Sequence, residues 1–166
     1  MNQLFLAITV TVRAVMANLD LFGSNKSIEW TTPRRLFVEL NEEFNFTLDP
    51  CCTEESALCD RYYTKKENGL LQNWSGDVVF ANPPYGRNVG VWLEKAYNES
   101  RNGAVVVCLV FSKTDTSWWH NYAMRADEIR YIRGRLKFGN AKHSAPFGSA
   151  ILIFRNHGNG RDTDED

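Results

Sequence analysis

The stretch Val78–Gly86 constrains the fold of this chain most strongly, because a short apolar segment leads directly into Asn82-Pro83-Pro84-Tyr85. Proline fixes φ and donates no ladder hydrogen bond, so the chain must leave a sheet here. Open α/β sheets bind ligands at such strand ends. An amide beside a rigid turn carbonyl can accept both hydrogens of an amino group, and Tyr85 offers a flat face for stacking. The stretch predicts a buried strand ending in a site for an aromatic amine; the alternative is a proline-stiffened surface turn.

The segments that follow predict a βαβ unit. Apolar residues recur at helical spacing from Val89 to Tyr97, and the pattern stops at Asn102-Gly103. Ala104–Phe111 is almost uninterruptedly apolar, which is typical of a parallel strand buried on both faces. Ala150–Phe154 predicts a final buried strand. We therefore expect an α/β fold.

The segment before Val78 predicts a capped helix and two strands. Thr32 suits the N-cap and Pro33 the first position of a helix that extends to Phe44. Phe44–Pro50 alternates aromatic and polar residues before Asp49, as a strand leading into a loop would. A carboxylate at the end of a strand can accept hydrogen bonds from a ligand. No glycine follows Asp49, however, so plain helix capping is the alternative role for this residue. Ala57–Thr64 is the candidate second strand.

A basic segment follows the central strands. Between Arg125 and Lys142 there are six basic residues and two acidic ones, in a chain of net charge −1. Basic residues interleaved with aromatic ones suit contact with a phosphate backbone. A solvated strand face is the alternative for so short a segment.

Length and composition bound the organisation of the chain. Its 166 residues suit one domain, which we expect at 28–155, with a disordered acidic tail at 156–166. Segment 1–27 is a frayed N-terminal segment or a gene-start artefact, with Met16 as the second candidate start. Its apolar part is too short to span a bilayer, so no membrane partner is expected. The four cysteines lack zinc spacing, so no metal site is expected either.

Five motifs in order between Trp30 and Phe154 resemble the small phage-type DNA N6-adenine methyltransferases. They are Trp-x-Thr-Pro, Phe-Thr-Leu-Asp, Asn-Pro-Pro-Tyr-Gly, Asp-Thr-x-Trp-Trp and Gly-Arg-Leu-x-Phe. The resemblance implies a Rossmann-like class I methyltransferase fold, three-layer α/β/α, with a mostly parallel sheet and an antiparallel C-terminal strand. It also implies S-adenosylmethionine as cofactor, double-stranded DNA as partner, a monomer or weak dimer, and the cytoplasm of a bacterial host.

The resemblance also implies residue roles. The catalytic set is Asn82, Pro83, Pro84 and Tyr85, and the cofactor-binding set is Thr32, Pro33, Asp49 and Pro50. The DNA-binding set is Arg130, Arg133, Arg135, Lys137, Phe138 and Phe147, with Phe138 or Phe147 as the opposite wall of the base pocket. Asp60 and Glu67 are both candidates for the cofactor ribose. For Trp118, Trp119 and His120 we favour a core-facing aromatic cluster over a catalytic histidine, although the resemblance places their loop in the pocket wall.

Two other functions remain open from the sequence. One is a methyltransferase acting on glutamine side chains or RNA, because Asn-Pro-Pro-Tyr also serves those enzymes. The other is a DNA-binding module that keeps the fold without binding cofactor, which the missing Gly-x-Gly turn after Asp49 suggests.

Overall fold

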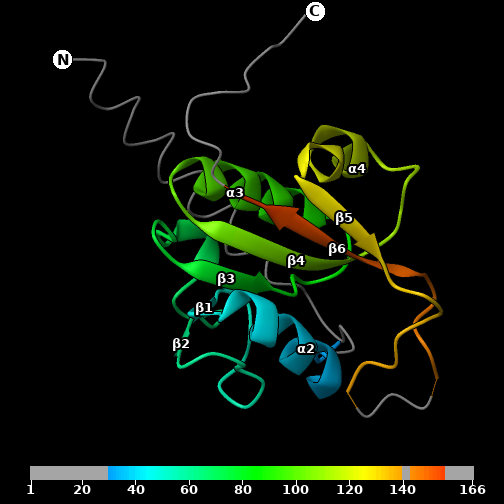
Figure 1. Ribbon diagram of the computed structural model, residues 1–166, viewed down its shortest axis with the longest axis horizontal. Helices are drawn as coiled ribbons and strands as arrows, with labels where there is room; N and C mark the ends of the chain where they lie inside the picture. Colours follow the sequence, from blue (N-terminus) through cyan, green and yellow to red (C-terminus); the bar gives the residue numbers. More distant parts are fainter. Residues whose placement is uncertain (1–29, 140–142, 156–166) are drawn as a thin grey trace, which may run out of the picture.

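The computed structural model describes residues 30–139 and 143–155. The chain alternates helices and short strands around one sheet (Figure 1). The elements are α2 (Arg34–Phe44), β1 (Leu48–Asp49), β2 (Arg61–Tyr62), the 3₁₀ turn η2 (Gly69–Leu71), β3 (Val78–Ala81), α3 (Val89–Arg101), β4 (Val105–Phe111), α4 (Ser117–Asn121), the 3₁₀ turn η3 (Ala123–Arg125), β5 (Glu128–Tyr131) and β6 (Ser149–Phe154). The predicted N-terminal segment and acidic tail lie outside the described residues.

Six strands form the sheet in the order β2-β1-β3-β4-β6-β5. The four strands β2, β1, β3 and β4 pair in parallel. The last strand, β6, is antiparallel to β4, from Val106 opposite Phe154 to Phe111 opposite Ser149. This confirms the antiparallel C-terminal strand expected from the sequence.

The direction of winding reverses at β1, which lies between β2 on one side and β3 on the other. The connection after β1 leads to one side and the connection after β2 returns to the other. Ligands of open α/β sheets bind outside the carboxyl ends of the strands at such a point. Asp49 ends β1 and Asn82 follows β3, so the topology places these two residues at the edge of the sheet where the ligand crevice of such folds is found.

Helices cover both faces of the sheet. On one face, Phe37 and Leu40 of α2 pack in a cluster with Phe80. On the other, Trp92 of α3 and Trp119 of α4 pack in a second cluster. Figure 1 shows the same separation, with α2 on one side of the strands and α3 and α4 on the other. β4 touches both clusters, because its alternate residues face opposite sides.

The elements before β3 are shorter than predicted. Helix α2 reaches Phe44 and ends at Asn45, whose φ of 55° lies in the left-handed region. Asn41 holds this end, because its backbone oxygen accepts from Asn45 N and its side-chain oxygen accepts from Phe46 N. The predicted strand Phe44–Pro50 is therefore reduced to Leu48–Asp49, and Ala57–Thr64 to Arg61–Tyr62.

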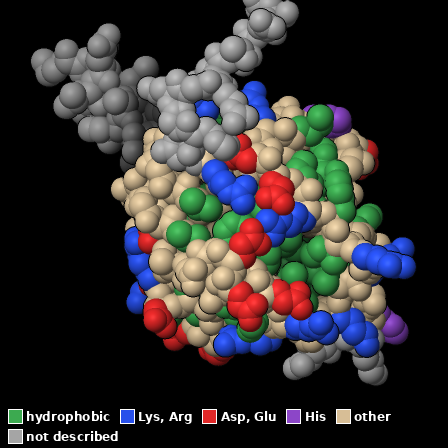
Figure 2. Space-filling model, viewed as in Figure 1, with side chains coloured by type: hydrophobic (Ala, Val, Ile, Leu, Met, Phe, Trp, Pro, Cys, Tyr) green, Lys and Arg blue, Asp and Glu red, His purple; other side chains and the backbone are tan. Residues whose placement is uncertain are grey.

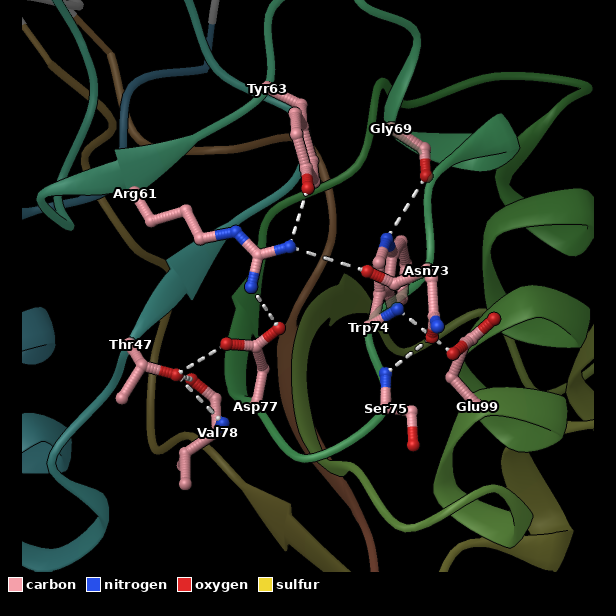
Figure 3. Close-up of polar contacts among 10 residues, drawn as sticks. All are labelled: Thr47, Arg61, Tyr63, Gly69, Asn73, Trp74, Ser75, Asp77, Val78 and Glu99. Atoms are coloured by element: carbon pink, nitrogen blue, oxygen red, sulfur yellow. Dashed lines mark hydrogen bonds and ion pairs between the residues drawn. The ribbon is translucent and has the colours of Figure 1, made fainter.

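The start of β3 is fixed by a polar network (Figure 3). The carboxylate of Asp77 accepts from Thr47 Oγ1 at 3.0 Å and from an Arg61 guanidinium nitrogen at 2.6 Å. These bonds join the three residues that precede or begin β1, β2 and β3. Because β3 is only four residues long, fixing its start also limits where Asn82 at its far end can lie.

A second anchor joins α3 to the turn before β3 (Figure 3). The buried carboxylate of Glu99 accepts from Trp74 N at 3.0 Å and from Lys95 Nζ at 2.5 Å. Trp74 Nε1 in turn donates to the backbone oxygen of Gly69 at 3.0 Å. Helix α3, predicted from Val89 and ending near Asn102-Gly103, is confirmed at Val89–Arg101.

The surface carries both signs of charge. On the face shown in Figure 2, basic and acidic side chains lie side by side rather than in one single-sign field. Within residues 30–139 and 143–155, no helix has the length and apolar character needed to cross a membrane. No group of three metal-ligating side chains occurs in the same described ranges.

Candidate active site

The side-chain amide of Asn82 is the centre of the candidate site. Its nitrogen donates to the backbone oxygen of Trp30 at 2.6 Å and to Thr32 Oγ1 at 3.0 Å. Its oxygen, Asn82 Oδ1, is buried and has no hydrogen-bond partner among the described residues. A buried acceptor without a partner costs free energy, of the order of 1–3 kcal/mol, and is uncommon in native structures.

The orientation of this amide follows from chemistry. The backbone carbonyl of Trp30 can only accept a hydrogen bond, so the amide nitrogen must face it. Turning the amide over would put two oxygens 2.6 Å apart. The oxygen of Asn82 is therefore the atom left for a ligand, and it can accept a hydrogen from an amino group.

Tyr85 lies in a cage of aromatic rings. Its ring stacks on Phe111 with centroids 3.9 Å apart and planes at 21°. Trp30 and Phe138 meet it edge-on, at 6.4 Å and 5.9 Å between centroids. The hydroxyl donates to the backbone oxygen of Leu109 at 3.4 Å, and burial raises the pKa of Tyr85 well above its usual range. Tyr85 therefore stays protonated and offers a ring rather than a phenolate.

The turn that joins Asn82 to Tyr85 is rigid at its start and permissive at its end. Pro83 is buried and Pro84 half-buried, and each fixes one φ angle. Gly86 follows with φ of 137°, a conformation that an L side chain rarely adopts. The turn can therefore hold the Pro83 carbonyl beside Asn82 while leaving a point of rotation after Tyr85.

Asp49 organises the loop that replaces a glycine-rich turn. Its carboxylate accepts from Cys51 N at 3.4 Å and from Leu58 N at 3.3 Å. Burial raises the pKa of Asp49 to about 6, although these two backbone bonds lower it. The Cys52 side chain makes a third hydrogen bond to this carboxylate. A carboxylate has about four acceptor positions, so one remains for a ligand such as an ammonium group.

Pro50 makes a close backbone contact that the sequence did not reveal. A β-carbon at Gly69 would lie 2.0 Å from the Pro50 carbonyl oxygen, so only glycine fits here. Gly69 is in turn held by Trp74 Nε1. The loop after Asp49 is thus supported by a glycine twenty positions away, rather than by one within the loop. An isolated glycine before an apolar pair gives no signal by which this contact could have been predicted.

The two ribose candidates are placed differently. Asp60 precedes β2 and so lies at the strand's amino end, away from the crevice. Glu67 follows β2, but its carboxylate accepts from Thr64 N at 3.0 Å and from Thr64 Oγ1 at 2.6 Å, closing a turn. The structure therefore brings neither carboxylate into the crevice as a free acceptor.

The predicted DNA-binding residues fall into three groups. Arg130 of β5 is engaged by two carboxylates, with 2.6 Å and 2.7 Å bonds to Glu43 and 2.6 Å and 3.1 Å bonds to Glu128. Three basic residues are exposed in the loop that leaves the sheet after β5 (Figure 1). They are Arg133, Arg135 and Lys137. The two phenylalanines differ: Phe138 is 1% exposed against the Tyr85 cage, and Phe147 is 44% exposed.

Lys113 lies beside the exposed Phe147, although no role was predicted for it from the sequence. Its ammonium lies 4.3 Å from the centre of the Phe147 ring, and Phe147 lies 5.7 Å from Phe111. Ser112 N donates to the backbone oxygen of Gly148 at 2.9 Å, which joins the loop after β4 to the loop before β6. A single lysine after a strand is so common that its role here could not be predicted from the sequence.

The tryptophan-rich turn after β4 contributes to the core. Trp119 is 3% exposed in the cluster under α3, on the opposite face from Tyr85, while Trp118 packs against that cluster. His120 is exposed. The core-facing interpretation is therefore confirmed for Trp119 and for the packed side of Trp118, and it is wrong for His120.

The fold is a mixed α/β arrangement of methyltransferase-like type, and the Asn82 amide lies after β3, beside the strand at which the sheet changes its direction of winding. The chain belongs to the DNA N-6-adenine-methyltransferase (Dam) family, whose model matches residues 23–161.

Two curated relatives are similar to this chain. It is 28% identical over 148 residues to the DNA N-6-adenine-methyltransferase of Escherichia phage T1, a match that covers 76% of this chain and 62% of the phage protein. It is 36% identical over 64 residues to the putative methyltransferase YfdM of Escherichia coli (strain K12), covering 34% of this chain and 70% of that protein. The chain thus spans less than two thirds of the length of the phage T1 protein.

Proposed function

We propose that this chain transfers a methyl group from S-adenosylmethionine to N6 of adenine in DNA. The observation that carries the proposal is the buried oxygen of Asn82, which is oriented by Trp30 and Thr32 and lacks a partner. Membership of the Dam family and the name of the phage T1 relative support it. Helices on both faces of a sheet with an antiparallel last strand also fit the Rossmann-like, three-layer class I architecture.

The reacting nitrogen is held by two acceptors. Asn82 Oδ1 and the backbone oxygen of Pro83 each accept one hydrogen of the adenine amino group, and this draws the nitrogen toward tetrahedral geometry. Its lone pair, otherwise delocalised into the ring, would then form the N–C bond as the sulfonium S–C bond breaks, and the nitrogen would release one proton to solvent. Orientation and polarisation of this kind supply the rate without a covalent intermediate.

The base must leave the duplex to reach this site, because its amino group is inaccessible in the stack. Tyr85 then stacks on the extruded ring. One face of Tyr85 is covered by Phe111 in this structure, and Asn82 Oδ1 is enclosed. Binding of the base therefore requires the turn to move until Asn82 Oδ1 and one face of the Tyr85 ring are accessible, with Gly86 as the point of rotation.

The cofactor side comprises Pro33, Asp49 and Pro50, next to Thr32, which the family resemblance assigned to the same side. S-adenosylmethionine would supply the methyl group on its sulfonium, and the remaining acceptor position of Asp49 suits its ammonium. The contact between Gly69 and Pro50 holds this loop in place.

The DNA side comprises Arg133, Arg135 and Lys137, whose exposed side chains can pair with phosphates. Lys113 and Phe147 extend this side at the rim of the Tyr85 cage. Arg130 is better explained by its bonds to Glu43 and Glu128, which use four of the five N–H donors of its guanidinium. Phe138 acts as a wall of the cage and not as an exposed contact. The phage T1 relative supports a phage-encoded protein that acts in the host cytoplasm, and a monomer or weak dimer stays the prediction for its assembly.

The test is methyl transfer from labelled S-adenosylmethionine to unmethylated duplex DNA, followed by digestion to nucleosides. The proposal expects label in N6-methyldeoxyadenosine. Label in RNA, in cytosine or in a glutamine-containing peptide offered in parallel would point to the other methyltransferase classes. Calorimetry with S-adenosylmethionine addresses the remaining alternative, because a DNA-binding module without cofactor shows no saturable heat.

A further inference from the structure

We infer that Thr32 is a positioning residue whose hydroxyl sets the plane of the Asn82 amide. The inference rests on the proposed function, since it gives a role to the same amide oxygen. It differs from the cofactor contact that the sequence suggested for Thr32, because the hydroxyl is already bonded to the residue that would hold the substrate amine.

The geometry assigns the two amide hydrogens to two different partners. Trp30 O takes one at 2.6 Å and Thr32 Oγ1 takes the other at 3.0 Å. With Trp30 alone, the amide could still rock about its terminal torsion, which has a broad energy well. The second bond removes this freedom, and Thr32 is itself 7% exposed and therefore held by its surroundings.

The Thr32 hydroxyl does not cap helix α2. The sequence predicted Thr32 as the N-cap, where its hydroxyl would accept from the first turn of the helix. This prediction is wrong, because Pro33 occupies the N-cap position of α2 and no side chain caps the helix. The Thr32 hydroxyl lies one residue before the cap and is bonded to Asn82 instead.

The backbone on either side fixes where the hydroxyl lies. Proline at position 33 restricts Thr32 to extended backbone conformations. The preceding residue, Thr31, accepts at its carbonyl from Gly139 N at 2.9 Å. The turn is therefore held from both sides, and it also links Asn82 to the segment that follows the exposed basic loop.

The experiment compares Thr32→Val, which keeps the shape and loses the hydroxyl, with Thr32→Ser, which keeps the hydroxyl. Thr31→Val is the matched control, because it makes the same change one residue away. Single-turnover methyl transfer is measured at saturating cofactor and DNA. Thr32→Val should be slower by about tenfold, the order of magnitude of the contribution of one hydrogen bond that orients the amide, and Thr32→Ser should recover most of the rate. Cofactor affinity, measured by calorimetry, should stay within about twofold.

A second readout does not depend on activity. In ¹⁵N-labelled protein, the side-chain amide signals of Asn82 should move and exchange faster in Thr32→Val, and should keep their positions in Thr31→Val. If wild-type protein methylates no DNA, the proposed function fails while this readout still decides the contact.

Three results would overturn the inference. The first is unchanged Asn82 amide signals in Thr32→Val. The second is a Thr32→Ser variant as slow as Thr32→Val while both remain folded. The third is a Thr32→Val defect that disappears at high cofactor concentration, since Thr32 would then belong to cofactor binding alone.

Discussion

The backbone of Gly69 lies so close to Pro50 that a β-carbon at position 69 would come within 2.0 Å of the Pro50 carbonyl oxygen. Because that contact is to backbone, Gly69→Ala must displace the loop after Asp49. We expect a loss of about 3 kcal/mol in the free energy of unfolding, at the upper end for overpacking, together with weaker cofactor binding.

Gly148→Ala is the control, because a β-carbon there meets nothing within 4 Å. Thermal melts and calorimetry with S-adenosylmethionine check the pair. A Gly69→Ala protein that melts and binds cofactor like the Gly148→Ala protein would show that the Pro50 contact does not hold the cofactor loop.

The buried carboxylate of Glu99 makes a second stability prediction. Glu99→Ala leaves the N–H of Trp74 unsatisfied and Lys95 without its partner, so unfolding should become easier by about 2–4 kcal/mol. Glu99→Gln should cost less, since its amide oxygen can still accept from Trp74. Glu39→Ala breaks only the exposed ion pair with Arg35 and should cost under about 0.5 kcal/mol. Urea denaturation gives all three values, and equal losses for Glu99→Ala and Glu39→Ala would refute the anchor.

Asp49 predicts a pH dependence of stability. Its pKa is raised by burial from 3.8 to about 6 in the folded protein, so the folded state binds the proton more tightly than the unfolded state. The stabilisation is complete below pH 4 and is lost as the pH rises through 6, amounting to about 3 kcal/mol at most. Unfolding free energies between pH 5 and 7 should therefore fall for wild type and stay nearly flat for Asp49→Asn.

The pH dependence of cofactor binding tests the same carboxylate, and it should run opposite to the pH dependence of stability. An ammonium group favours the ionised form, so affinity for S-adenosylmethionine should rise as the pH increases from 5 to 7. An affinity that is independent of pH in this range would argue against a contact between Asp49 and the ammonium.

Substitution by alanine should have different effects at Arg135, in the loop after β5, and at Arg130, within β5. Arg135→Ala should weaken binding to duplex DNA and reduce the salt slope by about one, as loss of one phosphate contact does. Arg130→Ala should instead lower stability, because it leaves Glu43 without its partner and Glu128 with Arg155 alone, and should keep the salt slope. Fluorescence anisotropy across a salt series separates the two; the opposite assignment would place Arg130 on the DNA.

The strands and helices near the centre were predictable because their signals are local. Ala104–Phe111 is apolar without interruption, and the strand Val105–Phe111 differs from it by one residue. The two prolines that follow Asn82 likewise indicated where β3 ends. The lengths of β1 and β2 were overestimated from the sequence, because only two residues of each strand form ladder pairs.

The partners within the site were not predictable, because they are distant in sequence. Asn82 bonds to Trp30 across 52 positions, and Arg130 bonds to Glu43 across 87. A sequence shows a cluster of positive charge but not the carboxylates that neutralise part of it. Likewise, the position before a helix suggested a cap for Thr32, whereas tertiary contact with Asn82 determines its hydrogen bond.

The role of the Asn82 oxygen is tested most directly by Asn82→Ala. Single-turnover methyl transfer to duplex DNA is measured beside calorimetric binding of S-adenosylmethionine, with the exposed Asn98→Ala as control. The account predicts a rate lower by about 10²–10³, typical for loss of one oriented polar group in an active site, with cofactor affinity unchanged. Near-normal turnover in an Asn82→Ala protein that binds cofactor normally would contradict it.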